Sequence, residues 1–151
     1  MPKRRLPVLQ NPPDGSDGPP RPAWQWVGFG ALAIVALWVP LSGLVGAVAA
    51  RSLPPTSDGA ALGRAALFTS AAYLAELALG AFAGGYLIGK WGPPGLGVRQ
   101  AALAGLAAAT VLAAGTWASL GPTIGGVLAI LVVSPAMAAL GGRTGARRRT
   151  V

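Results

Sequence analysis

Four long apolar segments, separated by short stretches rich in polar residues, glycine or proline, dominate this chain of 151 residues. The segments cover about residues 24–49, 64–88, 98–120 and 123–140. Apolar residues fill each segment almost continuously, without the alternation that marks a half-buried strand or a surface helix of a soluble protein. A helix of about 20 apolar residues crosses the ~30 Å hydrocarbon core of a bilayer. The pattern therefore predicts an all-α membrane protein, a bundle of four transmembrane helices.

Proline lies inside two of these segments. Pro40 predicts a kink in the first, because proline has no N–H and frees the backbone carbonyl four residues earlier. That carbonyl needs a donor, which a neighbouring helix, Ser42 or water can supply. The pair Ser134-Pro135 is expected to interrupt the fourth segment. Short connections are expected at residues 51–63, 92–95 and 121–122.

The composition fits a membrane protein and excludes several kinds of active site. The chain is 53% hydrophobic and only 11% charged, whereas soluble domains have about 25% charged residues. It contains no cysteine and no histidine, which excludes disulfides, metal and haem sites built on these residues, and the Ser-His and Cys-His nucleophile pairs. Of its four carboxylates only Glu76 lies inside a span. We therefore expect no enzyme and no bound cofactor or metal.

The net charge of +8 comes from basic residues at the ends of the segments. If both termini lie on one side, that side carries ten of the twelve lysines and arginines, and the other carries Arg51 and Arg64. This bias predicts that both termini face the cytoplasm, in the inner membrane of a cell. The basic residues do not alternate with aromatic residues on one face, so no nucleic acid partner is expected. Eight are candidate contacts to lipid head groups: Lys3, Arg4, Arg5, Lys90, Arg143, Arg147, Arg148 and Arg149.

Residues 1–22 and 143–151 are predicted to lie outside the membrane as cytoplasmic tails. The first contains seven prolines and few apolar residues, so it cannot offset its ordering entropy and is expected to be disordered. The second is basic. An alternative concerns the first span, because Ala47-Val48-Ala49 resembles a signal-peptidase site and cleavage there would leave three spans. The span is longer than the roughly 7–15 apolar residues of a signal peptide, so we expect it to be retained.

Glu76 lies at the centre of the second span, where a charge costs roughly 2.5–3.5 kcal/mol. At about 100° per residue, it shares a stripe of this helix with Thr69, Tyr73, Gly80 and Gly84. Membrane helices pack through small residues because these let the backbones approach. The stripe is therefore expected to face another helix and not lipid.

A carboxyl group buried in this stripe is expected to be neutral, because a surrounding of low dielectric constant penalises the charged form. Three polar side chains near the middles of the other spans are its candidate hydrogen-bond partners: Trp38, Thr110 and Ser134. The indole N–H of Trp38 needs an acceptor in hydrocarbon, which makes it the preferred partner. Two interpretations stay open. Glu76 forms a hydrogen bond that holds helices together, or it carries a proton, a cation or a charged partner.

Glycines four residues apart mark a packing face on the second span, Gly80 with Gly84 and Gly85 with Gly89, and Gly105 adds one on the third. We interpret the chain as a structural, assembly or accessory subunit without catalytic activity. It would pack through these faces in a homo-oligomer or a larger membrane complex. The alternative is a small transporter or channel component in which Glu76 is protonated and deprotonated.

Small bacterial membrane proteins rich in glycine and alanine, with about four spans and no known function, resemble one stretch of the chain. This is Leu79 to Ala109, LGAFAGGYLIGKWGPPGLGVRQAALAGLAAA, about a fifth of the sequence. The resemblance is one of composition, and it implies a bacterial inner membrane but no activity or ligand. Within the chain, the glycines of residues 84–90 are weakly echoed in residues 141–147, a match too short to indicate a duplication.

Overall fold

A computed structural model describes residues 22–52, 58–120 and 124–148, which form four α-helices and no strand. The helices are α1 (Ala23–Ser52), α2 (Gly59–Trp91), α3 (Gly97–Leu120) and α4 (Ile124–Arg147). Each is long and apolar enough to cross a membrane. The structure therefore confirms the prediction of four helices, each long and apolar enough to span a membrane, as in a multi-pass protein. The disorder predicted for the N-terminal tail concerns residues outside the described part of the chain, apart from Pro22.

α2 begins earlier than the sequence pattern predicts. Its first residue, Gly59, lies within the stretch that was expected to be a polar loop. Asp58 caps the helix, because its carboxylate accepts a hydrogen bond from the backbone N–H of Ala60 at 3.0 Å. Such a cap satisfies one of the N–H groups that have no partner at a helix start. The helix therefore extends beyond the apolar span that it contains.

Neither proline ends its helix. α1 continues through Pro40, and α4 continues through Pro135 to Arg147, past the expected end of the span at Leu140. The predicted interruption at Ser134-Pro135 is therefore wrong. Proline removes one backbone hydrogen bond from a membrane helix, and a helix can continue through it when another group satisfies the freed carbonyl.

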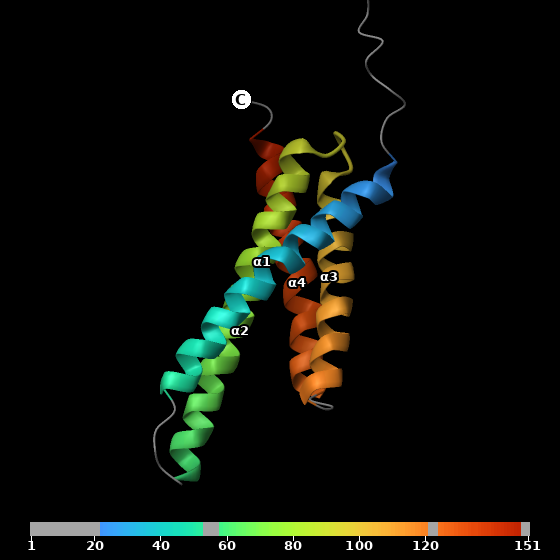
Figure 1. Cartoon of the computed structure of the whole chain (residues 1–151). Helices are drawn as coiled ribbons and strands as arrows, with labels where there is room; N and C mark the ends of the chain where they lie inside the picture. Colours follow the sequence, from blue (N-terminus) through green and yellow to red (C-terminus); the bar gives the residue numbers. More distant parts are fainter. Residues whose placement is uncertain (1–21, 53–57, 121–123, 149–151) are drawn as a thin grey trace, which may run out of the picture.

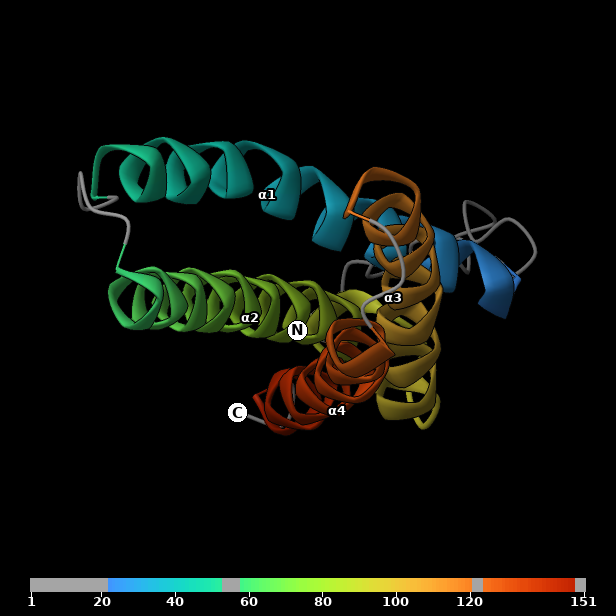
Figure 2. The same cartoon turned by 90° about the horizontal axis from the view of Figure 1, so that it is seen from below.

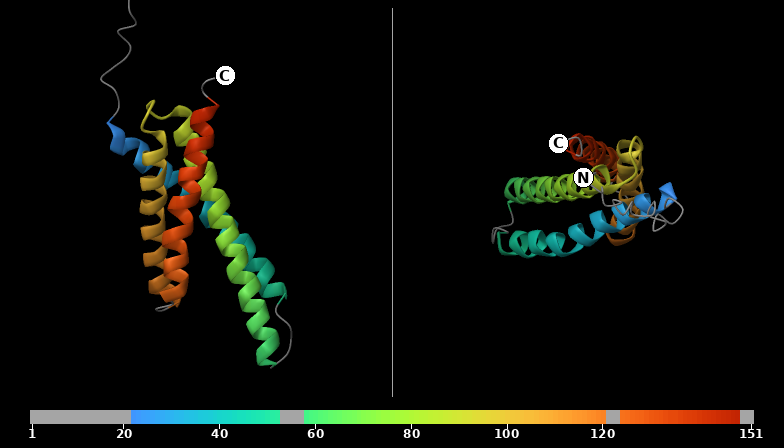
Figure 3. Two further views of the ribbon diagram at one scale, coloured as in Figure 1. Left: turned by 180° about the vertical axis from the view of Figure 1, so that it is seen from behind. Right: turned by 90° about the horizontal axis from the view of Figure 1, so that it is seen from above.

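The first and second helices diverge from the third and fourth (Figure 1). Near the end of the bundle that holds the start of α1 and the end of α4, α2 and α3 each pack against both α1 and α4. Toward the opposite end, α1 and α2 lean away from α3 and α4, as the view from below and the view from behind also show (Figures 2 and 3). We call residues 39–52 of α1 and 59–75 of α2 the α1–α2 arm. None of its residues is buried.

The two diverging pairs of helices differ in length. α2 has 33 residues and α4 has 24, which correspond to about 50 Å and 36 Å at 1.5 Å per residue. A helix much longer than the ~30 Å hydrocarbon core fits the membrane by tilting. The two longer helices, α1 and α2, are the pair that separates from the two shorter ones at one end.

Glycine brings the backbones of α2 and α4 into contact. A Cβ atom added to Gly85 would collide with the carbonyl of Ala138, and one added to Gly89 would collide with the carbonyl of Gly142. The residue numbers rise together on both helices, so α2 and α4 run parallel at this contact. Spacings of four residues between small side chains are typical of such close crossings in membranes.

The same contact uses glycines from the side of α4. A Cβ atom added to Gly141 would collide with the carbonyl of Phe82, and one added to Gly145 with the carbonyl of Tyr86. Residues 84–90 and 141–147 are therefore the two faces of one interface. The glycine echo in the sequence thus has a structural meaning, because both helices need small residues where they meet.

Candidate functional site

Glu76 lies where the α1–α2 arm joins the rest of the bundle. Only 8% of its surface is exposed, and it is the first buried residue along α2. On the same stripe of α2, an added Cβ at Gly80 would lie 3.8 Å from the Ile34 carbonyl of α1. The Tyr73 hydroxyl, one turn before Glu76, lies beside Gly46 of α1. Glu76 is therefore on the side of α2 that faces α1, and not on a lipid-facing side.

Neither carboxyl oxygen of Glu76 has a hydrogen-bond partner, and both oxygens are buried. The predicted bond from Trp38 is therefore absent. Trp38 instead packs against an apolar cluster that contains Ile34 and Leu77. Apolar packing thus orients the indole, and the carboxyl group is left without a donor or an acceptor.

The other two predicted partners form hydrogen bonds elsewhere. Thr110 is exposed, and its hydroxyl donates to the carbonyl of Leu106 in its own helix at 3.0 Å. Ser134 is fully buried, and its hydroxyl donates across to the Gly105 carbonyl of α3 at 2.9 Å. Glu76 therefore bonds to none of its three predicted partners, and the hydrogen bond of Ser134 joins α4 to α3 instead.

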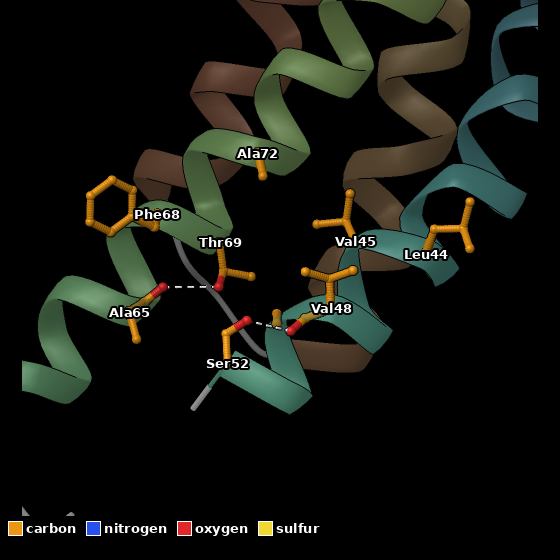
Figure 4. A pocket seen from close by; sticks show the side chains of 9 residues that line it. Leu44, Val45, Val48, Ser52, Ala65, Phe68, Thr69 and Ala72 are labelled. Carbon is orange, nitrogen blue, oxygen red and sulfur yellow. Dashed lines mark hydrogen bonds between the residues drawn. The ribbon is translucent and has the colours of Figure 1, made fainter. Parts of the chain in front are cut away.

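A groove of about 600 Å³ separates the two helices of the arm (Figure 4). Its walls are mainly apolar side chains, and its two hydroxyl groups donate within their own helices. Thr69 donates to the Ala65 carbonyl at 2.9 Å, and Ser52 donates to the Val48 carbonyl at 2.7 Å. The predicted polar stripe of α2 leads from this groove at Thr69, through Tyr73, to Glu76.

Glu76 has no basic residue near it along α2. The nearest basic residue along α2 is Arg64, twelve residues away, or about 18 Å along the helix. In the part of the chain that the structure describes, no three acidic, histidine or cysteine residues gather to hold a metal ion. A lone buried carboxyl group can still exchange a proton or pair with one monovalent cation.

Gln100 is a second buried polar residue, and the sequence analysis did not single it out. It is 3% exposed, and neither atom of its amide group has a hydrogen-bond partner. It lies beside Gly92, sixteen residues beyond Glu76, or about 24 Å along α2. The two groups therefore do not form one site. The sequence feature that could have indicated Gln100 is its polar side chain within the first turn of an otherwise apolar span.

The predicted packing glycines all lie in contacts between helices of this chain. Gly80 and Gly84 face α1, and Gly85 and Gly89 face α4. Gly105 lies against α4, where an added Cβ would be 2.8 Å from the Ser134 carbonyl oxygen. Their role in the described structure is therefore intramolecular, which leaves a different surface for contacts with other chains.

The structure describes four of the eight residues that were predicted to contact lipid head groups. Lys90, Arg143, Arg147 and Arg148 are exposed at the end of the bundle where α2 and α4 end. The Lys90 ammonium lies 5.6 Å from the centre of the Trp91 ring, a cation–π geometry. The other four candidates lie outside the described residues: Lys3, Arg4, Arg5 and Arg149.

No protein-family model, curated protein sequence or solved structure matches the chain. Two features of the structure bear on function: the surface that the packed glycines leave open, and the buried carboxyl group of Glu76.

Proposed function

We propose that the chain is a non-catalytic subunit of a bacterial inner-membrane assembly and that it associates with other chains through the outer face of α1. A stripe of small exposed residues supports this proposal. Its members recur every three or four positions and so share one face of the helix: Ala36, Pro40, Gly43, Ala47 and Ala50. Small residues on one face let a second helix approach closely in a membrane.

The burial of the helices favours α1 as the association surface. Only Gly30 and Ile34 of its 30 residues are buried. Eight residues of α2 and five of α4 are buried, and their glycines are already used within the chain. Gly43 has no atom within 4 Å of the place where a Cβ would lie. Gly43 therefore leaves room for a second helix to approach, as the glycines between α2 and α4 do within the chain.

Pro40 gives a second reason to expect another helix on this face, because proline frees a backbone acceptor in its helix. It frees the carbonyl of Ala36, which belongs to the same stripe. Ser42 does not compensate, because its hydroxyl donates to the Val39 carbonyl at 2.9 Å. A backbone acceptor without a donor is costly in hydrocarbon. A donor from a second helix on this stripe would remove that cost.

Cysteine cross-linking tests the association surface, because the chain has no cysteine of its own. In membranes, single variants Gly43→Cys and Ala47→Cys are expected to form disulfide-linked products under mild oxidation. Leu79→Cys is the matched control, since Leu79 is 70% exposed on α2 and away from the stripe. A product of twice the 15.0 kDa chain mass identifies a second copy, and another mass identifies a different subunit. Equal cross-linking at all three positions would rule the stripe out.

A second function, proton or cation binding, is favoured by the burial of Glu76 without a hydrogen-bond partner. Such a group in a membrane helix is a functional candidate in its own right. It is compatible with the first proposal, because a subunit of a transporter or channel both associates and conducts. The substitutions that separate a functional from a structural Glu76 are given in the Discussion.

The orientation of the chain is proposed from its basic residues. The start of α1, the turn between α2 and α3, and the end of α4 lie at one end of the bundle. The excess of lysine and arginine assigns that end to the cytoplasm. Reporter fusions after residue 94 and at the C-terminus are expected to be cytoplasmic, and fusions after residues 57 and 122 periplasmic. A periplasmic C-terminus would contradict the assignment.

A further inference from the structure

A groove between α2 and α4 opens near the end of the bundle that holds the end of α4. Its volume is about 440 Å³, and six residues line it: Phe82, Ala83, Tyr86, Leu87, Thr144 and Arg148. The α2 residues supply apolar walls, and Arg148 lies just beyond the last residue of α4. Gly145 packs beside Lys90, so Arg148, three residues later, lies near the level where α2 ends. The groove is therefore apolar toward the membrane core and cationic at its outer end.

The charged side chains that the structure describes around this groove are basic. Five exposed basic residues lie at the same end of the described bundle: Lys90, Arg99, Arg143, Arg147 and Arg148. The described residues include only two carboxylates, Asp58 at the start of α2 and Glu76 in its middle. Described side chains therefore provide no negative charge at this end. Arg148, which lines the groove, is complementary in charge to an anion from the surroundings.

We infer that this groove binds one anionic phospholipid. The phosphate pairs with the Arg148 guanidinium, and the hydroxyl of Tyr86 supplies a second donor. The hydroxyl of Thr144 is not available as a donor, because it already donates to the Gly141 carbonyl at 2.8 Å. One acyl chain lies along the apolar walls formed by Phe82, Ala83 and Leu87. Basic pockets between helices at the cytoplasmic side of membrane proteins hold such head groups.

Lipid-dependent thermal stability tests this assignment on the full chain in detergent. Dioleoylphosphatidylglycerol is titrated into the protein, with dioleoylphosphatidylcholine as the neutral comparison. Phosphatidylglycerol is expected to raise the midpoint of unfolding at lower concentration than phosphatidylcholine. Arg148→Gln is expected to need about five times more phosphatidylglycerol for the same shift, the effect of one lost basic contact near the surface. Native mass spectrometry counts the lipids that stay bound.

Two variants distinguish lipid binding in the groove from attraction of lipid to the overall positive charge. Arg99→Gln removes the same charge from α3, outside the groove, and is expected to respond to phosphatidylglycerol as the unsubstituted chain does. Ala83→Phe keeps the charge and fills the apolar part, and is expected to lose the retained lipid. Equal losses in Arg99→Gln and Arg148→Gln would overturn the assignment. So would full retention of lipid by Ala83→Phe, or an equal stabilising shift from glycerol phosphate without acyl chains.

Discussion

Gly85→Ala is expected to lower the free energy of unfolding by about 2–3 kcal/mol, a large change for one added methyl group. The new Cβ would overlap the carbonyl of Ala138 and lie 2.8 Å from the Cα of that residue. These are backbone atoms, so no side-chain rotation relieves the collision, and α2 and α4 have to separate. Gly141→Ala tests the same contact from α4 and is expected to behave alike. Unfolding of the purified protein in detergent measures both.

Gly63→Ala is the matched control for this experiment, because it makes the same change in the same helix. No atom lies within 4 Å of the place where its Cβ would lie. Alanine is also favoured over glycine in helices by about 1 kcal/mol. The control is therefore expected to be as stable as the unsubstituted chain or slightly more stable. Equal stability of Gly63→Ala and Gly85→Ala would show that α2 and α4 do not pack through these glycines.

Glu76→Leu is expected to raise the stability of the isolated chain by about 1–3 kcal/mol. Both carboxyl oxygens are buried without a partner, and a buried polar group without a hydrogen bond carries a penalty of this size. Leucine has a similar volume and removes that penalty. The same unfolding measurement provides the test. A clear loss of stability in Glu76→Leu would mean that Glu76 forms a stabilising bond in the membrane.

Glu76→Gln separates shape from charge. The amide keeps the size of the side chain and its ability to form hydrogen bonds, but it cannot release a proton. It is expected to fold and to lack the stability gain of leucine, because its polar atoms are equally buried. If Glu76 binds a proton or a cation, both variants fold and both lose the flux or growth phenotype of the unsubstituted chain. Full activity of both variants would remove the second proposed function.

The number and order of the helices follow from the sequence, because a membrane span needs a continuous apolar run that hydropathy reveals directly. The ends of the helices do not. α2 begins at Gly59, directly after its cap Asp58 and five residues before Arg64, where the apolar span was expected to begin. α4 runs seven residues beyond Leu140. Polar and basic residues continue a helix outside the hydrocarbon region, so the end of an apolar run does not mark the end of a helix.

The tertiary contacts depend on information that one sequence carries only weakly. The stripe through Glu76 and Gly80 correctly indicated a face toward another helix, because small residues identify a surface. It could not identify which helix would cover that face. The prediction that Trp38 donates a hydrogen bond to Glu76 was therefore wrong. The depth of a residue along a span gives the level of its side chain in the membrane, but not the direction in which the side chain points. Gln100 was missed for the same reason, because its burial depends on how α3 packs against α2.

The mass of the particle extracted from the membrane with its surrounding lipid tests the proposed association most directly. We expect the unsubstituted 15.0 kDa chain to be recovered with at least one further protein chain. Gly43→Ile, which places a branched side chain in the small-residue stripe of α1, is expected to be recovered alone. Gly63→Ile, on an exposed position of α2, is expected to keep the partner. Recovery of the unsubstituted chain as a single copy without a partner would contradict the proposal.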